Sequence, residues 1–275
     1  MIKRVETPSI KRPGNAADEI FEVLRSRILD GIYPAGLKLS QAELADQLSV
    51  SRTPLREALS RLQAHGLVTA TNNKGVEVAA LQLDEAEQSY ALRLLIEPSI
   101  ISGLIDDFTP ADFNRMKRAL NEMHLYSGRA KDYQDAHLAF HEVALTRYPK
   151  VMQDMIKGIY WKITRHQRAY FLKPNTSGDF ADLDDLFLDA LVQKNAELAR
   201  QYLEMHLIDA GLGLLADIDP DYVPKTLLLT AKGLGIHIEC DAYGKPARPA
   251  QILWNGRQPV KMPVLSTTNL EHKGE

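Results

Sequence analysis

The sequence predicts a mainly α-helical protein: a small helical module with a strand hairpin, a larger all-helical bundle, and a short β-rich appendage. Apolar residues recur every three or four positions over most of the chain, which is the period of a helix. Strand-like runs interrupt this pattern only at residues 67–78 and again after Pro220. Prolines and glycines separate the periodic segments. Helices are therefore expected to carry most of the fold.

Composition limits the class of protein. The chain has 275 residues, of which 45% are apolar and 25% charged, and this size predicts one or two folded domains. It contains no run of 18 apolar residues, and its start does not read as a signal peptide, so we expect a cytoplasmic protein without membrane contact. The single cysteine, Cys240, fits a reducing compartment. A metal site would have to rely on histidines and carboxylates.

The first helices follow a polar arm at residues 1–14, which we expect to be flexible. Over residues 16–30 apolar side chains recur four positions apart, which predicts an amphipathic helix. A second, shorter helix is expected over residues 41–48, where Ser40 and Glu43 have the spacing of a capping box. Two helices in close succession are therefore predicted.

A third helix and a hairpin complete the module. Ser51 can cap a helix that runs to Gly66. Two strands are expected next, at residues 67–70 and 76–78, with a tight turn between them at residues 72–75. Three helices followed by a hairpin are typical of a winged helix-turn-helix, so we expect this fold over residues 15–79.

One face of the third helix is suited to DNA. Arg52 and Arg56 lie four residues apart, opposite the apolar positions, and arginine can make paired hydrogen bonds to guanine in the major groove. Ser51 and Thr53 can reach a phosphate or a base edge, and Lys74 in the tight turn can reach phosphate or the minor groove. The alternative is a solvated helix face, since such modules also serve as protein contacts.

Charge alone does not decide between these alternatives. Residues 1–80 hold 11 lysines and arginines against 9 acidic residues, and the remainder holds 22 against 27. This asymmetry is weaker than nucleic-acid-binding domains usually show. The order of the residues is the stronger signal.

A second domain is expected after a linker at residues 80–84. Six helical segments follow it, at residues 85–105, 110–127, 131–146, 150–172, 179–193 and 195–217. They predict an all-helical domain over residues 85–218. Residues 219–275 form an extension whose role the sequence does not predict. A β hairpin is expected there, with strand-like runs at residues 227–229, 236–238 and 251–254 and the turn signal Asn255-Gly256.

The amino-terminal part resembles the GntR family of bacterial transcription regulators. The resemblance covers nearly all of residues 16–79 and rests on GLKLSQAELA at 36–45, VSRTPLREAL at 50–59 and GLV at 66–68. It implies that operator DNA is contacted by the third helix and the wing tip, through Ser51, Arg52, Thr53, Arg56, Lys74 and Gly75. Ala42 stands where relatives often have a DNA-contacting arginine, so the preferred operator sequence is expected to differ.

The helical part resembles the FCD subfamily of effector-binding domains over about residues 85–217. The matching pieces are Arg93-Leu94-Leu95-Ile96-Glu97, Phe140-His141 and Met205-His206-Leu207. In many relatives an aspartate and three histidines hold a divalent metal. The resemblance therefore implies four metal ligands here: His137, His141, Asp184 and His206. Relative to the family pattern, His137 and Asp184 have exchanged residue types.

Elementary chemistry allows this ligand set. His137 and His141 are one helical turn apart and point the same way, and later helices of a bundle can face them. Three imidazoles and one carboxylate suit Zn most, with Ni or Mn as alternatives. A packing role for the histidine pair remains the other interpretation. Asp182 or Asp185 would replace Asp184 if the alignment were shifted.

Arg93 and Arg165 are the expected effector-binding residues. Arg93 follows the period of Leu92 and Ile96, which we expect to face inward, and the matching arginine of relatives takes a carboxylate. An ion pair with Glu97 is the alternative. A metal beside arginines favours a small carboxylate as effector.

The combined hypothesis is a ligand-responsive regulator, most simply a repressor, that binds double-stranded operator DNA as a homodimer. A metal-dependent enzyme acting on an organic acid is the alternative, because an open metal position can activate water. No catalytic residue is predicted, since Glu142 beside His141 points about 100° away along the helix.

Overall fold

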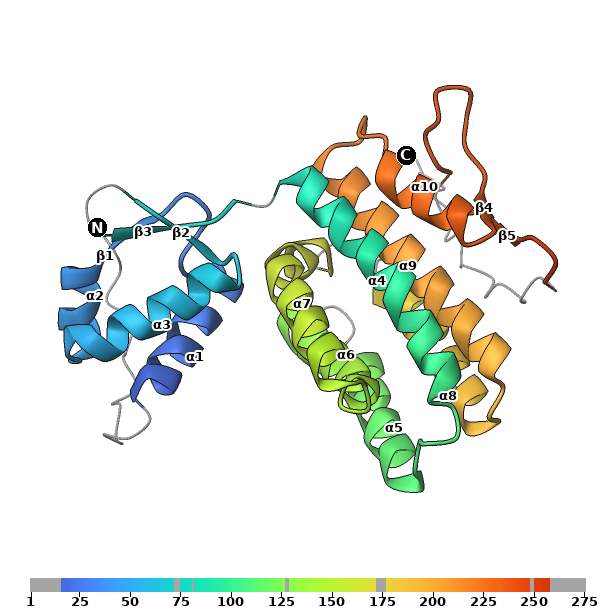
Figure 1. Ribbon diagram of the computed structural model, residues 1–275, viewed down its shortest axis with the longest axis horizontal. Helices are drawn as coiled ribbons and strands as arrows, with labels where there is room; N and C mark the ends of the chain where they lie inside the picture. The colour runs from blue at the N-terminus through green and yellow to red at the C-terminus, as the bar shows by residue number, and fades with distance from the viewer. Residues whose placement is uncertain are drawn as a thin grey trace, which may run out of the picture. The chain divides into compact units, whose positions relative to one another are not determined.

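The computed structural model describes residues 16–71, 75–80, 82–126, 129–171, 177–247 and 250–257 (Figure 1). Helices predominate and the sheets are small and antiparallel, which confirms the predicted fold class. The chain divides into two compact units. The first holds residues 1–86 and 149–169, and the second holds residues 87–148 and 170–275. The predicted flexible arm and the wing tip at residues 72–74 lie outside the described residues.

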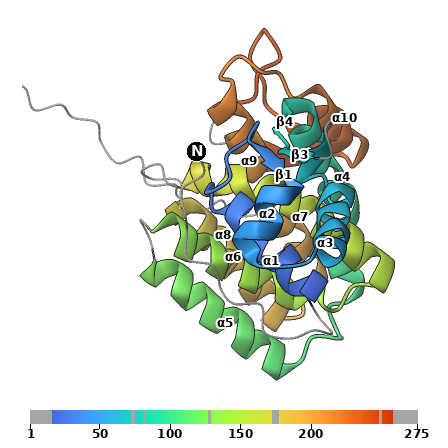
Figure 2. The ribbon, with the colours of Figure 1, turned by 90° about the vertical axis from the view of Figure 1, so that its left-hand side faces the viewer.

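The first unit contains the winged helix. Its elements are α1 (Ala16–Leu29), β1 (Lys38–Ser40), α2 (Gln41–Leu48), α3 (Arg52–Ala64), β2 (Val68–Ala70) and β3 (Gly75–Val78). The predicted hairpin is part of a three-stranded sheet in the order β1-β3-β2. β1 was not predicted, because three residues carry no alternating pattern and their pairing partner lies far along the chain. Helices α2 and α3 pack against each other (Figure 2).

The apolar stripes of the three helices meet in one core. Ile20, Leu24, Leu55 and Leu62 are fully buried there, as the helical periodicity predicts. Burying a side chain of this size contributes roughly 1.5–3 kcal/mol. The core therefore holds α3 in place and leaves its opposite face exposed.

The predicted capping interactions are wrong in detail. Ser40 and Ser51 occupy the N-cap positions of α2 and α3 with extended backbones, but neither side chain makes a capping hydrogen bond. Ser40 is also the last residue of β1 and pairs with Gly75, so the sheet sets its backbone. Position at the helix start was predictable, whereas side-chain orientation was not.

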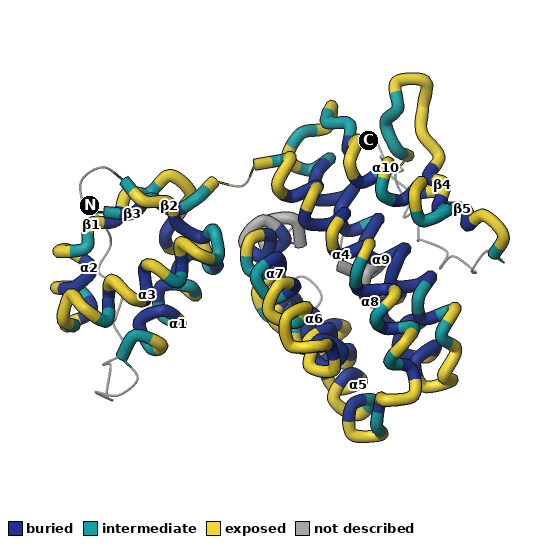
Figure 3. The backbone as a smooth tube through the Cα atoms, viewed as in Figure 1, coloured by how far each residue is buried: buried dark blue, intermediate teal, exposed yellow. Residues whose placement is uncertain are grey.

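The second unit is a helical bundle with an extension. Its helices are α4 (Leu83–Gly103), most of which lies in this unit, α5 (Pro110–Leu125), α6 (Ala130–Leu145), α8 (Ser177–Val192) and α9 (Ala196–Ile218). Helix α5 packs against α6 and α8, and α8 packs against α9. Along α9 buried residues face all sides, as Figure 3 shows. Among the described helices none is long and apolar enough to cross a membrane.

Helix α7 (Lys150–Phe171) follows α6 in the sequence. Residues 149–169, which make up most of it, belong to the compact unit of the winged helix. The sequence predicted this helix as part of the all-helical domain over residues 85–218, whereas the division into compact units groups most of it with the winged helix.

The extension mixes a helix with two strands, α10 (Lys225–Gly233), β4 (Ile236–Ile238) and β5 (Ile252–Trp254). The strand predicted at residues 227–229 is wrong: Leu227 and Ala231, four apart, are buried on one face of α10. The strands predicted at residues 236–238 and 251–254 are present as β4 and β5 and pair with each other. They are connected by the long segment 239–251 rather than by a tight turn. Asn255-Gly256 follows β5, so it is not the turn between them.

Two buried carboxylates anchor the extension to the bundle. Glu87 of α4 accepts hydrogen bonds from the Tyr222 hydroxyl at 2.6 Å and the Leu227 backbone N–H at 2.9 Å. Glu204 of α9 accepts one from the Trp254 indole at 2.7 Å. A carboxylate buried without such donors would be costly. The extension thus packs on the bundle through hydrogen bonds to α4 and α9.

Candidate DNA-reading face and metal centre

The first two turns of α3 present the predicted DNA contacts. Arg52, Thr53 and Arg56 are exposed, and so is Ser51 at the N-cap. Buried and exposed residues alternate along α3 with its helical period (Figure 3). The face is therefore accessible to a groove of DNA while the opposite face holds the core.

The wing is only partly described. Lys74 lies outside the described residues, and Gly75 is the first residue of β3. A Cβ on Gly75 would lie 2.9 Å from the Leu39 carbonyl oxygen, so close strand approach by itself requires glycine there. A role for either residue in DNA contact stays a prediction.

The four predicted metal ligands come together in the second unit. His137 and His141 lie on α6, Asp184 on α8 and His206 on α9, and one ligand atom from each lies within 4.8 Å of the others. The Nε2 atom of His137 lies 3.1 Å from Nε2 of His141 and 3.3 Å from Nε2 of His206. Residues up to 69 positions apart thus form one cluster.

The Asp184 carboxylate closes the cluster. Its Oδ1 atom lies 3.4 Å from Nε2 of His141 and 3.3 Å from Nδ1 of His206, and its Oδ2 lies 3.6 Å from Nε2 of His137. Ligand atoms bound at 2.0–2.1 Å around a tetrahedral zinc would be separated by about 3.4 Å. The separations of 3.1–3.6 Å are close to that spacing, but they involve both ring nitrogens of His206 and both oxygens of Asp184. With one ligand atom from each residue, the four atoms lie within 4.8 Å of one another.

Burial makes the cluster unusual. All four residues are at most 5% exposed. Burial lowers the pKa of His141 to about 3 and that of His137 and His206 well below the usual range, with the Arg93 charge acting in the same direction. Burial also raises the pKa of Asp184 to about 7. The histidines are therefore neutral and available as ligands at neutral pH.

The surroundings of the Asp184 carboxylate indicate whether the cluster is suited to a cation. Neither oxygen of Asp184 has a hydrogen-bond partner among the described residues, although the side chain is 1% exposed. An ionised carboxylate in such a place requires a positive charge. A divalent cation bound by three imidazoles and this carboxylate would satisfy it.

The neighbouring aspartates do not compete for the site. Asp182 is exposed, and Asp185 accepts a hydrogen bond at 2.9 Å from His124 outside the cluster. The geometry therefore favours Asp184, at the register that the resemblance implies. Swapping the family's residue types at two positions leaves the donor set complete.

Arg93 lies on α4, is 1% exposed and donates a hydrogen bond from Nε to Glu97 at 2.5 Å. Its charge also acts on all four cluster residues, lowering each pKa. The ion pair with Glu97 is therefore present, and a role of Arg93 in effector binding stays a prediction. The expected inward position of Leu92 is wrong, since this residue is 44% exposed while Arg93 and Leu94 face inward. Arg165 lies on α7, and its side chain is outside the described part.

Aromatic rings surround the cluster, and the sequence reasoning did not single them out. The Tyr133 ring stacks parallel to His137 with centroids 6.4 Å apart, and Phe187 lies 6.5 Å from His141. Phe140 contacts both His141 and Phe187. Tyr133 precedes His137 by one helical turn, and Phe187 follows Asp184 by about one, so helical spacing from the ligands could have identified these two rings.

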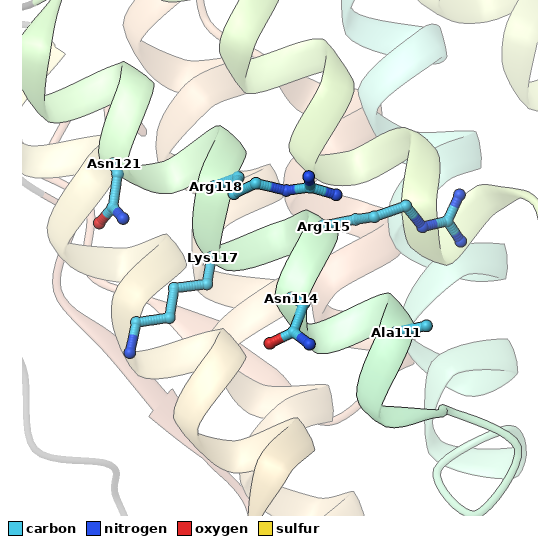
Figure 4. Close-up of a pocket in the computed structure, with 6 residues that line it drawn as sticks. All are labelled: Ala111, Asn114, Arg115, Lys117, Arg118 and Asn121. Atoms are coloured by element: carbon cyan, nitrogen blue, oxygen red, sulfur yellow. The ribbon is translucent and has the colours of Figure 1, made fainter.

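A surface hollow on α5 is the other feature that the sequence did not indicate. It has a volume of about 560 Å³ and is lined by Ala111, Asn114, Arg115, Lys117, Arg118 and Asn121 (Figure 4). Its lining is basic but open to solvent. It therefore lacks the exclusion of water that distinguishes the buried cluster.

Two family models match the chain in succession. The model described as bacterial regulatory proteins of the gntR family matches residues 16–78, and the FCD domain model matches residues 88–209. The first match spans the winged helix, and the second contains all four cluster residues.

Relatives with similar sequences are named as regulators. A transcriptional regulator of Agrobacterium vitis is 34% identical over 84 residues, which is 30% of this chain and 49% of that protein. The galactonate operon transcriptional repressor of Escherichia coli K12 is 26% identical over 213 residues, covering 68% of this chain and 91% of the repressor. The chain spans only 33–49% of the length of three of the relatives that it matches.

Solved structures agree with this grouping. A Rhodococcus sp. RHA1 protein described as a GntR transcriptional regulator superimposes with a TM-score of 0.61 at 26% identity, covering 75% of this chain and 98% of that one. The names of these relatives are those of transcriptional regulators rather than enzymes. With a GntR-type winged helix followed by an FCD domain, the chain belongs to the GntR family of bacterial regulatory proteins.

Proposed function

We propose that this protein is a ligand-responsive transcriptional repressor whose helical domain binds a small organic acid beside a divalent metal. The observation that carries the proposal is the exposed face of α3, on which Arg52 and Arg56 project from a helix held by a complete apolar core. Family membership supports the DNA-binding class. The function also implies a cytoplasmic location, because that is where bacterial operators are.

Operator recognition rests on α3 and the wing. Arg52 and Arg56 are suited to guanine edges, and Ser51 and Thr53 to phosphates at the start of the helix. Lys74 and Gly75 would bring the wing to the minor groove. One such module buries too little surface for operator affinity, so the active form is a homodimer on a pseudo-palindrome.

The metal proposed for the cluster is Zn, with Ni or Mn as alternatives. His137, His141, Asp184 and His206 would hold it, and three neutral imidazoles with one carboxylate leave a net charge of about +1. A bound cation supplies positive charge, and an increase from four to five ligands would give an anionic ligand a coordination position. The guanidinium of the buried Arg93 also acts on the cluster, and its ion pair with the buried Glu97 offsets part of this positive charge.

A small carboxylate is the effector class that this charge pattern favours. Arg93 is the first proposed partner of its carboxylate group, and Arg165 is the second candidate. One relative is named as the repressor of a galactonate operon, and galactonate is itself a small carboxylate. That name supports both the effector class and the repressor assignment.

The chemistry next to the cluster argues against the enzyme alternative. Glu142, the acidic residue that follows His141, is exposed, whereas the cluster is buried. It is therefore not directed at a metal-bound water.

Selection from a random duplex pool tests the function. The purified protein should enrich a short pseudo-palindrome and protect it from cleavage, and the double variant Arg52→Ala, Arg56→Ala should not. Arg118→Ala, on the exposed face of α5, is the matched control and should enrich the same sequence as wild type. Unchanged protection by the double variant would refute the assignment of α3.

A further inference from the structure

Helix α7 contacts the winged helix through Trp161. The Trp161 ring centroid lies 5.6 Å from that of Phe21 on α1 and 4.3 Å from that of His65, in an edge-on arrangement. The Arg25 guanidinium lies over the same ring at 5.0 Å. Trp161 therefore packs against the core that positions the DNA-reading helix.

The contact is made at one end of the reading helix. His65 is the C-cap of α3, and its backbone N–H donates to the Arg61 carbonyl oxygen at 3.0 Å. On α7, a Cβ on Gly158 would lie 3.8 Å from Nδ1 of His65. Arg52 and Arg56 lie toward the other end of the same helix. Because a short, packed α-helix moves as a rigid body, a displacement at the His65 end changes the orientation of the end that carries Arg52 and Arg56.

Burial lowers the pKa of His65, and the neighbouring charges of Arg61 and Arg25 lower it further. The imidazole is thus neutral at neutral pH and packs as an aromatic ring against Trp161. The contact is a packing contact rather than an ion pair.

The connections of α7 lead to the metal cluster on both sides. Helix α6, which carries His137 and His141, ends at Leu145, and α7 begins at Lys150. Helix α8, which carries Asp184, follows α7. The cluster lies in the other compact unit, so α7 is the segment between two ligand-bearing helices that packs with the winged helix.

We propose that α7 transmits the occupancy of the metal and effector site to α3, with Trp161 and Gly158 as the points of contact. This inference rests on the proposed function and names how its site regulates DNA binding. Ligand occupancy must favour one arrangement of α7 over another, since equal affinity for both would shift nothing. Couplings of this kind change affinity by about 5- to 150-fold.

Tryptophan emission tests whether α7 responds. The chain has two tryptophans, Trp161 and Trp254, so Trp254→Phe leaves Trp161 as the reporter and Trp161→Phe leaves Trp254. Zn²⁺ added to chelator-treated Trp254→Phe protein should shift the emission or its iodide quenching, with the same midpoint as Zn²⁺ binding measured by a competing chelator. Zn²⁺ binding without any change at Trp161 would overturn the proposal.

DNA affinity tests whether the response reaches α3. The duplex is the sequence that the wild type enriches, and its affinity is measured with and without Zn²⁺. Gly158→Phe places a bulky ring against His65 without removing core atoms, and it should abolish the effect of Zn²⁺ on DNA affinity while Zn²⁺ binding persists. Gly158→Ala, whose added Cβ meets only ordinary contact, should respond like the wild type.

The outcomes separate this inference from the function on which it rests. Absence of Zn²⁺ binding by the wild type refutes the metal site and, with it, the transmission. Wild-type binding of both Zn²⁺ and DNA with no effect of one on the other refutes the transmission alone. A Zn²⁺ response in Gly158→Phe equal to that of the wild type also refutes it. Circular dichroism confirms that each variant is folded.

Discussion

The candidate DNA-reading face and the cluster of three histidines and Asp184 are built on opposite principles. The reading face uses charged residues of one short segment that are exposed, and its support is an apolar core behind them. The cluster uses buried polar residues from three helices. Within it, neither oxygen of Asp184 has a hydrogen-bond partner among the described residues. Exposed charges are solvated and can be changed without harm to the fold, whereas buried ones are tolerated only with their partners. Substitutions in the two regions should therefore have different effects.

The largest expected effect is the loss of a metal ligand. His141→Ala should weaken Zn²⁺ binding by at least about 100-fold, since removing even outer partners of ligands costs 10–100-fold. DNA binding by the winged helix should persist, because its core lies in the other unit. Competition with a chromophoric chelator measures the first quantity and a gel-shift assay the second.

His124→Ala is the matched control, because this histidine is exposed and pairs with Asp185 outside the cluster. It should bind Zn²⁺ like the wild type. Equal metal affinity in His141→Ala and His124→Ala would show that the cluster has a packing role and does not bind the metal.

The second prediction concerns pH in the metal-free protein. The three histidines stay neutral when folded, with a pKa of about 3 for His141, but take up protons near pH 6.5 when unfolded. Asp184, with its pKa raised to about 7, acts oppositely, since the folded state holds a proton that the unfolded state holds only near pH 4. About two protons net are thus bound on unfolding between roughly pH 6 and 5.

The free energy of unfolding should therefore fall by roughly 2–3 kcal/mol for each pH unit lowered in that window. Urea unfolding in the presence of a chelator measures it. His141→Gln removes one titrating group and should reduce the slope by about 1.4 kcal/mol per unit. If the free energy of unfolding of the metal-free wild type did not change with pH in this window, the histidines of the cluster would not be neutral in the folded state.

The third prediction concerns the exposed face. Arg56→Ala should weaken binding to the enriched duplex by about 1–3 kcal/mol and relax the base preference at one position. Its thermal unfolding should match that of the wild type, because the side chain is exposed and takes no part in the core. Loss of stability without loss of base preference would contradict the division between the two regions.

The smallest effect is expected from restoring the family's ligand order. His137→Asp combined with Asp184→His keeps three imidazoles and one carboxylate, so Zn²⁺ affinity should stay within about 10-fold of the wild type. Each single change alters the donor set and should bind less tightly than the double variant. Zinc content after dialysis ranks the four proteins, and a double variant no better than the singles would show that the two positions are not interchangeable.

The sequence by itself determined the elements whose signals are local. The apolar period located helices α1 to α9 but not α10. The segment from Ser51 to Arg56 contains the candidate reading face within two turns of one helix. The types and order of the four cluster residues were available through the resemblance, with His137 and His141 separated by a single helical turn.

Only the tertiary structure decided the features that depend on distant contacts. It brought Asp184 and His206 to the α6 histidines, paired the short β1 with β3, and turned residues 227–229 into a helix face covering the bundle. It also grouped most of α7 with the winged helix. A periodic pattern states that a helix has an apolar side. Which neighbour that side meets depends on the packing of the whole chain, because hydrophobic burial has no direction of its own.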